Sequence, residues 1–462
     1  MRRFFALSLG LGLGMAACSA ARPGPSSVPS GAGAATPSAV PSAPAGASAA
    51  TTPSADPSTS SAVAVGPAEA ASGSAAPSST ASAGASASAP SPGLSVPPDA
   101  LTTFYAALRE LECGSRKSHV RVAWLGDSHA QADFWTGAVR QALQQRFGDA
   151  GPGFVHIGFR EYRHDGVRIS VHGRWRMRPK KPATTERYKD GNLGLGGLLT
   201  SGYAEEPFAS LELTDQGLTG QSVGWDLCYK LSEASDEFRV ELVGVPPKTV
   251  KLSAKVGGLH HLKLQGKGLG KLEVTSVNGK PELCGVLIET DAASKPGIVL
   301  DNLGLNGARY ATALAWDPVL WGAELARRNP ELVVLEFGGN EASDLTPRPE
   351  DYKRQVQSLL KRMRAVRADV SCLVVGLAER SDKEARIPTI RDAQRDAAAE
   401  AGCMFWDTYE VMGGRGSMQR WVDEKKAGAD GIHLLPRGYA ELGSKLVADL
   451  MAGYQGGCAD KH

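Results

Sequence analysis

The sequence predicts an α/β fold, in which a parallel β-sheet carries helices on both faces, with a β-rich module inserted into it. Strand and helix patterns alternate over residues 99–159 and again over residues 298–462, which is typical of a parallel sheet. Between them, residues 160–297 change to short β-rich segments separated by Gly, Pro and Asn-Gly. We therefore expect one core domain made of the two outer segments and one module that interrupts it.

Length and charge narrow the class of protein. The chain has 462 residues, with 51 Lys+Arg against 49 Asp+Glu. This near balance argues against a dedicated nucleic-acid binder, whose phosphate contacts need a clear basic excess. An apolar run stands at the N-terminus and no second long one follows, so we expect no membrane-spanning domain.

Residues 19–98 differ in composition from the rest of the chain. They consist almost entirely of Ala, Ser, Pro, Gly, Thr and Val. Such a segment cannot bury enough apolar surface to offset the entropy that is lost on ordering. We expect a disordered tether, which as a flexible coil spans on the order of 50 Å.

The first residues predict export. A positive start, Met1–Arg3, precedes an apolar stretch of signal-peptide length, Phe4–Met15. The next residues, Met15-Ala16-Ala17-Cys18, are similar to the bacterial lipobox, which implies a lipoprotein signal over residues 1–18 and a lipid anchor on Cys18. The alternative is ordinary cleavage near Ala17 or Ala20, which leaves a free thiol.

The residue after Cys18 bears on where the anchor is placed. Ser19 stands where an aspartate signals inner-membrane retention in the lipoproteins that this segment resembles. We therefore expect a protein that is lipid-anchored in the cell envelope, on the outer membrane facing the periplasm in a host with two membranes. Its contact with the membrane is expected through the anchor only.

The cysteines after Cys18 are even in number, and an oxidising compartment allows them to pair. They are widely spaced and form no CxxC motif or Cys/His cluster, so we expect no zinc site. The sequence does not choose between their possible pairings. They are Cys113, Cys228, Cys284, Cys372, Cys403 and Cys458.

Hydrophobic periodicity places the individual elements. The expected strands of the core domain cover residues 120–125, 298–303, 332–337, 372–377 and 404–406. The expected helices cover residues 99–111, 131–147, 308–327, 349–366, 388–401 and 436–451. The β-rich segments of the module cover residues 167–171, 210–213, 237–243, 250–256 and 271–277. Asn278-Gly279 predicts a hairpin turn.

A serine stands between the first expected strand and the next helix, in Gly126-Asp127-Ser128-His129. Ligands of open α/β sheets bind at the carboxyl ends of the strands, and a helix N-terminus there stabilises anions. This position suits a nucleophile. The alternative is that Ser128 or Asp127 merely caps the helix.

An aspartate and a histidine precede the last expected helix, in Asp430-Gly431-Ile432-His433. This spacing lets the carboxylate hold the imidazole from behind, which leaves the other ring nitrogen free to take a proton from a serine hydroxyl. Both residues of a catalytic pair can thus come from one loop. The alternative is again a helix cap.

Two glycine-containing loops follow other expected strands. The strand at 332–337 ends in Phe337-Gly338-Gly339-Asn340-Glu341, where the Asn340 amide can donate to a developing oxyanion. The strand at 298–303 is followed by Gly304-Leu305-Asn306-Gly307-Ala308, where the backbone N–H of a glycine is a second candidate donor. Both loops are equally compatible with ordinary turns.

Taken together, these signals run in the order Ser, Gly, Asn, Asp-x-x-His, and the sequence resembles the SGNH hydrolase superfamily, also called GDSL esterases. Block one is matched by Gly126-Asp127-Ser128, block two by Gly307, block three by Gly338-Gly339-Asn340 and block five by Asp430 to His433. Glu341 stands where many members carry Asp. The resemblance covers residues 118–455 apart from the module, and implies a three-layer, flavodoxin-like sandwich.

Within that superfamily, residues 125–155 are similar to the periplasmic peptidoglycan O-acetylesterases. The similarity lies in Gly126-Asp127-Ser128-His129, in Ala132-Asp133-Phe134 and in Phe147-Gly148-Asp149-Ala150-Gly151. Those enzymes also carry a β-rich, carbohydrate-binding-like module after block one. Residues 160–297 correspond to it in position.

The resemblance implies a role for each site residue. Ser128 is the expected nucleophile, His433 its general base and Asp430 the group that orients the histidine. The Ser128 N–H, the Gly307 N–H and the Asn340 side chain form the expected oxyanion hole. We expect supporting roles for Asp127 and Gly339 and a positioning role for His129. The implied chemistry needs no metal and no organic cofactor.

The expected function is a serine esterase that removes O-acetyl groups from an envelope polysaccharide, with peptidoglycan as the favoured glycan. An O-acetyltransferase uses the same residues when a sugar hydroxyl outcompetes water, and the sequence does not decide between the two. The sequence is also compatible with a lipase, a thioesterase or a glycan-binding lipoprotein without activity. Protein partners are not indicated.

Overall fold

The computed structural model describes residues 91–160, 162–188, 191–204, 206–251, 258–344, 348–383 and 386–458. Residues 1–90 lie outside the described residues. They include the expected signal at 1–18 with Cys18 and the expected tether, 19–98, as far as Pro90. The described residues fall in one compact unit. None of their helices is both long and apolar enough to cross a membrane.

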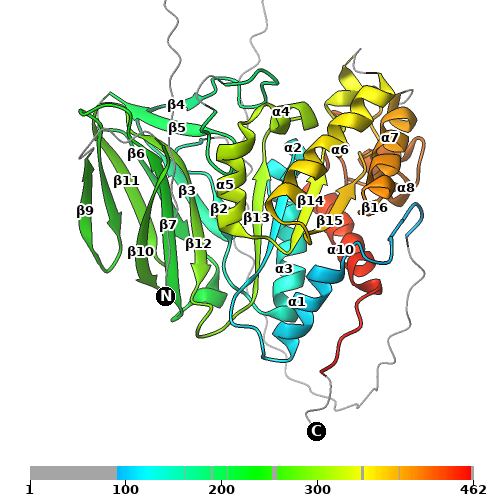
Figure 1. The fold of residues 1–462 in the computed structure, drawn as a ribbon. Coiled ribbons are helices and arrows are strands. Elements are labelled where there is room, and N and C mark those ends of the chain that lie inside the picture. Colours follow the sequence, from blue (N-terminus) through cyan, green and yellow to red (C-terminus); the bar gives the residue numbers. More distant parts are fainter. Residues whose placement is uncertain are drawn as a thin grey trace, which may run out of the picture. The chain divides into compact units, whose positions relative to one another are not determined.

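A five-stranded sheet forms the centre of the α/β domain (Figure 1). Its strands lie in the order β13-β1-β14-β15-β16, and every neighbouring pair is parallel. Counted along the chain this order is 2-1-3-4-5, the flavodoxin-like order that the resemblance implies. The strands are β1 (Val120–Gly126), β13 (Ile298–Gly304), β14 (Leu332–Glu336), β15 (Ser371–Val375) and β16 (Met404–Trp406).

Helices cover both faces of this sheet, because successive side chains of each strand point to opposite faces and both sets are apolar. Val122 and Trp124 of β1 belong to the core cluster that includes α1, α3 and α10. Ala123 and Leu125 belong to the cluster that includes α5, α6 and α7. The α-helices are α1 (Thr102–Glu112), α2 (Ser128–Gln131), α3 (Trp135–Phe147), α4 (Tyr310–Ala315), α5 (Pro318–Arg328), α6 (Pro349–Val366), α7 (Ile387–Glu400), α8 (Thr408–Met412), α9 (Ser417–Asp423) and α10 (Pro436–Ala452).

The expected β-rich module consists of two antiparallel sheets (Figure 1). The first has the order β10-β7-β12-β5-β4, with β2 also paired to β12, and its strands are β2 (Gly153–Val155), β4 (Arg174–Arg178), β5 (Leu199–Tyr203), β7 (Ser222–Lys230), β10 (His260–Lys267) and β12 (Glu282–Thr290). The second has the order β3-β6-β11-β8-β9, and its strands are β3 (Val167–Val171), β6 (Phe208–Leu213), β8 (Glu237–Leu242), β9 (Val245–Lys251) and β11 (Lys271–Asn278). Because β2 pairs with β12, the module's first sheet begins at Gly153, before the expected boundary at 160.

Two expectations about individual elements were wrong. The helix expected at 308–327 is broken into α4 and α5, because Pro318 cannot continue a helix but fits the first turn of a new one, which Asp317 caps. Asn278-Gly279 forms a turn with Gly279 at φ +68°, but it is not a hairpin. The strands on either side of that turn, β11 and β12, belong to different sheets.

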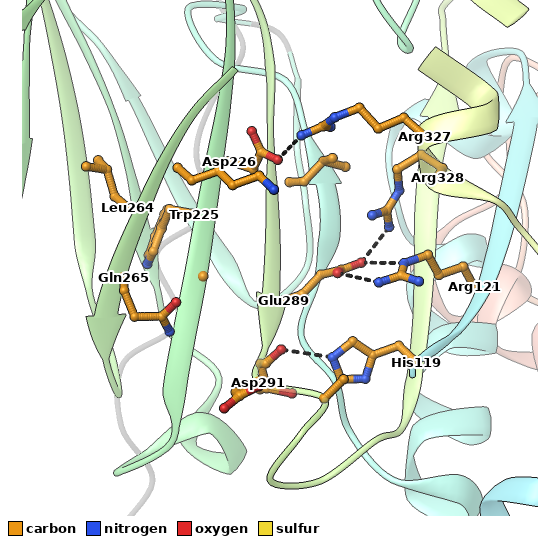
Figure 2. Close-up of a pocket in the computed structure, with 15 residues that line it drawn as sticks. His119, Arg121, Trp225, Asp226, Leu264, Gln265, Glu289, Asp291, Arg327 and Arg328 are labelled. Carbon is orange, nitrogen blue, oxygen red and sulfur yellow. Dashed lines mark hydrogen bonds and ion pairs between the residues drawn. The ribbon is translucent and has the colours of Figure 1, made fainter. Parts of the chain in front are cut away.

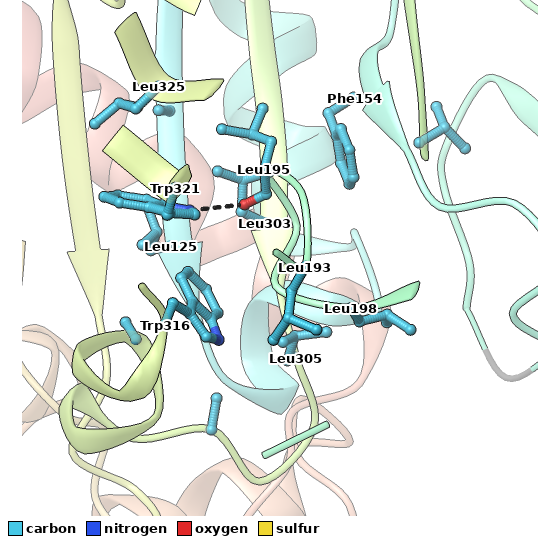
Figure 3. Close-up of a cluster of buried hydrophobic side chains, with 14 of the residues drawn as sticks. Leu125, Phe154, Leu193, Leu195, Leu198, Leu303, Leu305, Trp316, Trp321 and Leu325 are labelled. Carbon is cyan, nitrogen blue, oxygen red and sulfur yellow. Dashed lines mark hydrogen bonds between the residues drawn. The ribbon is translucent and has the colours of Figure 1, made fainter. Parts of the chain in front are cut away.

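The module and the α/β domain share one hydrophobic core. Figure 3 shows Leu193, Leu195 and Leu198, from the segment between β4 and β5, beside Trp316 and Trp321 of the α/β domain. The Trp321 indole N–H donates to the Leu195 carbonyl oxygen at 3.0 Å. Burial of this apolar surface fixes the module against the α/β domain.

A polar cavity of about 400 Å³ lies at another part of this junction, beside the start of β1 (Figure 2). The Glu289 carboxylate of the module accepts hydrogen bonds from Arg121 at 3.0 and 2.8 Å and pairs with Arg328 at 2.7 Å. Arg327 pairs with Asp226 of the module. Ion pairs therefore supplement the shared core in holding the two parts together.

His261 lies in the same junction, between two carboxylates. Its Nδ1 is 3.4 Å from Asp226 Oδ1 and its Nε2 is 3.3 Å from Glu324 Oε1. Burial alone lowers the pKa of His261, but its contact with the Asp226 carboxylate and its hydrogen bond to Glu324 outweigh burial and raise that pKa to about 9.

We expect His261→Gln to destabilise the protein in a pH-dependent way. The folded-state pKa lies above the ordinary value of 6.5, so the stabilisation is fully present below pH 6.5 and is lost as the pH rises through about 9. The difference in unfolding free energy between the two proteins should shrink by on the order of 2 kcal/mol from pH 6 to pH 10. Denaturant titrations at both pH values measure it, and a constant difference would contradict the ion-pair assignment.

Three disulfides use all six cysteines after Cys18. Cys113 at the end of α1 pairs with Cys458, Cys228 in β7 with Cys284 in β12, and Cys372 in β15 with Cys403 just before β16. The structure thus selects one of the pairings that the sequence leaves open.

Candidate active site

The predicted site residues lie beyond the carboxyl ends of neighbouring strands of the core sheet. Ser128 follows β1, Gly307 follows β13 and Asn340 follows β14, while His433 precedes α10. After β1 the chain forms β13 on one side of it and then β14 on the other side. This reversal of direction opens a crevice between the loops that follow these strands. The cavity there has a volume of about 570 Å³. Its lining is Asp127, Ser128, His129, Ala132, Phe134, Asn306, Gly307, Gly339, Asn340, Ser343, Arg380, Ile432, His433, Leu434 and Tyr439.

Ser128, His433 and Asp430 form a continuous hydrogen-bonded chain. His433 Nε2 lies 2.9 Å from Ser128 Oγ, and His433 Nδ1 lies 2.7 Å from Asp430 Oδ2. With Nδ1 protonated toward the carboxylate, Nε2 is left to accept the serine proton. The expected three-residue spacing does bring carboxylate and imidazole together.

The Asp430 carboxylate is held ionised by its own loop. Burial alone raises the pKa of Asp430, but hydrogen bonds from the His433 ring and from the backbone N–H groups of Ile432 and His433 outweigh it and lower that pKa. The two backbone bonds, at 3.0 Å each, go to Oδ1 and leave Oδ2 for the imidazole. The loop thereby fixes the direction from which the carboxylate meets His433.

The expected oxyanion donors surround the serine. Among the residues that the structure describes, the backbone N–H groups of Ser128 and Gly307 donate to no protein acceptor. The Asn340 amide donates to the Ala308 carbonyl oxygen at 3.0 Å and to Asp127 Oδ2 at 3.3 Å, which fixes the side chain in the cavity wall. Their action on an oxyanion stays a prediction.

An arginine that the sequence analysis missed joins the two donor loops. Arg309 Nη1 donates to the Gly307 carbonyl oxygen at 2.9 Å, and Nη2 to the Asn340 carbonyl oxygen at 3.4 Å. Its other contacts are with the Asp344 carboxylate, at 2.8 and 2.9 Å. Arg380, also missed, donates to the Gly339 carbonyl oxygen and pairs with Asp382. A single arginine in a loop carries no sequence signal for such a role.

Buried carboxyl groups lie behind the nucleophile. Asp127 accepts from the His129 backbone N–H at 3.0 Å, and burial raises the pKa of Asp127 to about 6. Glu336, at the end of β14, accepts from the Asp127 N–H at 3.3 Å, and burial raises the pKa of Glu336 well above its ordinary value. A Cβ on Gly339 would lie 3.2 Å from Asp127 Oδ2, which explains a small residue there.

Glu341, the residue that departs from the family pattern, is also buried. It accepts from the backbone N–H groups of Tyr310 at 2.9 Å and Gly338 at 3.1 Å, and burial raises the pKa of Glu341 to about 8. The side chain thus fastens the block-three loop to the start of α4.

His129 is a wall residue rather than a second base. Its Nδ1 lies 2.8 Å from the Tyr439 hydroxyl, and its ring centroid lies 5.5 Å from that of His433. Burial first, with the charges of His433 and Arg380, lowers the pKa of His129 to about 3, so the ring is neutral. A positioning role for His129 stays a prediction.

One group of possible metal ligands stands outside the cavity, in the described part of the chain: Cys228, His261 and Glu324. Cys228 is joined to Cys284 in a disulfide, so it offers no thiolate. His261 is already hydrogen-bonded to Glu324. These residues do not make a metal site.

The chain is similar to known proteins in sequence and in structure. Residues 277–441 match the model of the GDSL-like Lipase/Acylhydrolase family. A solved peptidoglycan O-acetylesterase is 25% identical, with a TM-score of 0.63 over 75% of this chain and 95% of that one. A lipase/acylhydrolase from Enterococcus faecalis is 19% identical, with a TM-score of 0.28 over 35% of this chain and 80% of that one. A family two carbohydrate esterase from Clostridium thermocellum is 11% identical, with a TM-score of 0.27 over 62% and 98%. No curated protein matches the sequence.

The parallel sheet, the serine, histidine and aspartate chain and the family match define the class. The chain carries a GDSL-like acylhydrolase domain and is a carboxylic ester hydrolase. Its fold is that of an SGNH sandwich with an inserted β-rich module, similar to a peptidoglycan O-acetylesterase over most of both chains. The predicted fold class and family are confirmed.

Proposed function

We propose that this protein is a serine O-acetylesterase that removes acetyl groups from a cell-envelope polysaccharide, with peptidoglycan as its substrate. The observation that carries the proposal is the hydrogen-bonded Ser128, His433 and Asp430 chain in a protein that matches a peptidoglycan O-acetylesterase over 75% of its length. The two catalytic segments alone make up only about half of the 462 residues, so that match extends into the module.

The surroundings of the triad fit a polymeric substrate better than a lipid. The side chains of His433 and Asp430 are 45% and 48% exposed, so a bulky glycan can approach the nucleophile. The cavity lining mixes polar and charged groups with apolar ones, and includes Asn306, Ser343 and Arg380. A lipase needs a broad apolar crevice for its acyl chain.

The geometry supports a two-step acyl transfer. Ser128 Oγ attacks the ester carbonyl carbon while His433 Nε2 takes its proton, and the oxyanion receives hydrogen bonds from Ser128 N–H, Gly307 N–H and Asn340. The bond between the carbonyl carbon and the sugar oxygen then breaks while His433 protonates that oxygen, which releases the sugar hydroxyl and leaves an acetyl-Ser128 ester. Water, deprotonated by His433, attacks this ester and releases acetate and free Ser128. Asp430 supports the imidazolium in both steps.

The position of the protein is part of the proposal. We place it in the cell envelope, exported by the signal at 1–18 and anchored through lipid on Cys18, with residues 19–90 as the tether. Residues 91–98, expected in the tether, belong to the folded domain instead, because the Ser95 backbone exchanges hydrogen bonds of 3.0 and 2.8 Å with that of Phe405. A span on the order of 50 Å for that tether lets the catalytic domain reach a polymer layer away from its membrane.

Acetate release tests the proposed activity. We expect the protein to release acetate from O-acetylated peptidoglycan and from p-nitrophenyl acetate, with a higher kcat/KM on the polymer than on acetylated xylan. A sugar acceptor is added in parallel. Acetyl groups appearing on that acceptor in place of free acetate would overturn the hydrolase assignment in favour of an O-acetyltransferase, and equal rates on all esters would overturn the choice of peptidoglycan.

A further inference from the structure

A second cavity, of about 660 Å³, lies within the β-rich module, along β4 and β5 and the segment that follows β2. Aromatic and cationic side chains form most of its wall. We call it the arginine-aromatic cleft and define it by Phe159, Arg160, Arg174, Trp175, Arg176, Lys180 and Tyr203.

The charge of the cleft is of one sign. Its lining holds four cationic side chains and no acidic one. Within the described part of the chain, none of the four is paired with a carboxylate. Arg174 and Lys180 are exposed, whereas Nε and Nη2 of Arg176 are buried and donate no hydrogen bond to a described residue. Positive charge in a concave wall attracts anions.

The aromatic side chains are held in place from behind. The Trp175 indole N–H donates to the His172 carbonyl oxygen at 2.9 Å, and the ring packs so closely on Gly158 that a Cβ there would lie 2.4 Å from it. Tyr203 is 38% exposed, and the Arg176 guanidinium lies 5.9 Å from its ring centroid. Fixed rings with accessible edges give a surface for ligands that combine apolar faces with polar groups, as sugar rings do.

The cleft lies close to the catalytic cavity along the chain. Phe159 lines the cleft, and four residues later Arg163 lies over the Phe134 ring at 4.1 Å from its centroid. Arg163 also donates to the Ala132 carbonyl oxygen at 2.9 Å, and both Ala132 and Phe134 line the catalytic cavity. Four residues span at most about 14 Å, so Phe159 of the cleft and Arg163 beside the catalytic cavity lie within that distance of each other.

We propose that the arginine-aromatic cleft binds a carboxylate-bearing part of the same glycan chain whose ester is cleaved at Ser128. The ligand class is an anionic glycan: the aromatic rings contact sugar faces, and the arginines and the lysine bind the carboxylates. This inference rests on the proposed function and specifies its substrate further. It assigns the module the task of selecting acidic over neutral polysaccharides.

Binding by a catalytically inactive chain tests the inference apart from the esterase assignment. The full chain with Ser128→Ala is titrated with oligosaccharides of alternating N-acetylglucosamine and N-acetylmuramic acid, and with N-acetylglucosamine oligomers of equal length that lack the carboxylate. We expect binding of the carboxylated ligand that weakens with added salt, and at least about tenfold weaker binding of the neutral one.

The double variant Arg174→Glu and Lys180→Glu reverses the charge of the cleft at its exposed positions. Its matched control, Lys248→Glu and Lys267→Glu, makes the same change in charge on exposed strand positions of the same module. We expect about tenfold or greater loss of affinity in the cleft variant and less than twofold in the control. In the active chain, KM for O-acetylated peptidoglycan should rise while hydrolysis of p-nitrophenyl acetate is unchanged.

Equal binding of the carboxylated and neutral oligosaccharides, or equal losses in the two double variants, would overturn the inference. Either result leaves the esterase assignment standing if acetate release from the polymer still requires Ser128. Conversely, a carboxylate-dependent, cleft-dependent affinity in a chain that releases no acetate would support the cleft and reject the proposed function.

Discussion

Ser128→Ala is expected to lower kcat for p-nitrophenyl acetate by about 10⁴- to 10⁶-fold. The reason is that Ser128 Oγ is the group that lies 2.9 Å from His433 Nε2 and faces the catalytic cavity. His129, the neighbouring ring, is buried and neutral and is engaged with Tyr439, so it offers no substitute. Initial rates measured with enough enzyme to detect this loss give the value.

The partner variants sharpen this expectation. His433→Ala should lower kcat almost as much as Ser128→Ala, and the double variant no further than either, because the two residues act as one unit. Arg168→Ala, an exposed position on the module, serves as the matched control and should keep full activity. If Ser128→Ala retained more than a hundredth of the activity while folded by circular dichroism, Ser128 would not be the nucleophile.

Much of the site was predictable because its catalytic residues either follow a recognisable strand or lie together in one loop. Ser128 stands two residues after the end of β1 and Asn340 four residues after the end of β14, and these strands are mostly apolar because both of their faces are buried. Asp430 and His433 share one loop, so their contact depends on local spacing alone. Local signals of this kind can be recognised in the sequence without knowledge of the fold.

What the sequence could not supply depends on contacts between distant segments. Cys113 and Cys458 are 345 residues apart, and only the docking of the C-terminal segment beside α1 brings them together. The turn at Asn278-Gly279 has the expected chemistry, but the pairing of β12 with β7 carries the next strand into another sheet. The role of Arg309 likewise depends on two loops that meet only in the folded protein.

Asn340→Ala is expected to lower kcat by about 10²- to 10³-fold, with little change in KM. An oxyanion donor acts on charge that develops in the transition state, so its loss affects the chemical step more than ground-state binding. Asn340→Asp should be at least as damaging, because the carboxylate replaces a donor with an anion that faces the buried Asp127. Steady-state kinetics on p-nitrophenyl acetate measure both.

Arg309→Ala separates positioning from direct donation in the same oxyanion hole. Arg309 holds the Gly307 and Asn340 loops through their carbonyl oxygens and is itself fixed by Asp344. Its loss should lower kcat by about tenfold, and Arg309→Lys should restore little, because a lysine cannot contact Asp344 and both loops at once. In the Asn340→Ala background, Arg309→Ala should cost less than in the wild type, since one of the two donors that it positions is already gone. Additive losses would show that Arg309 stabilises the fold without positioning the donors.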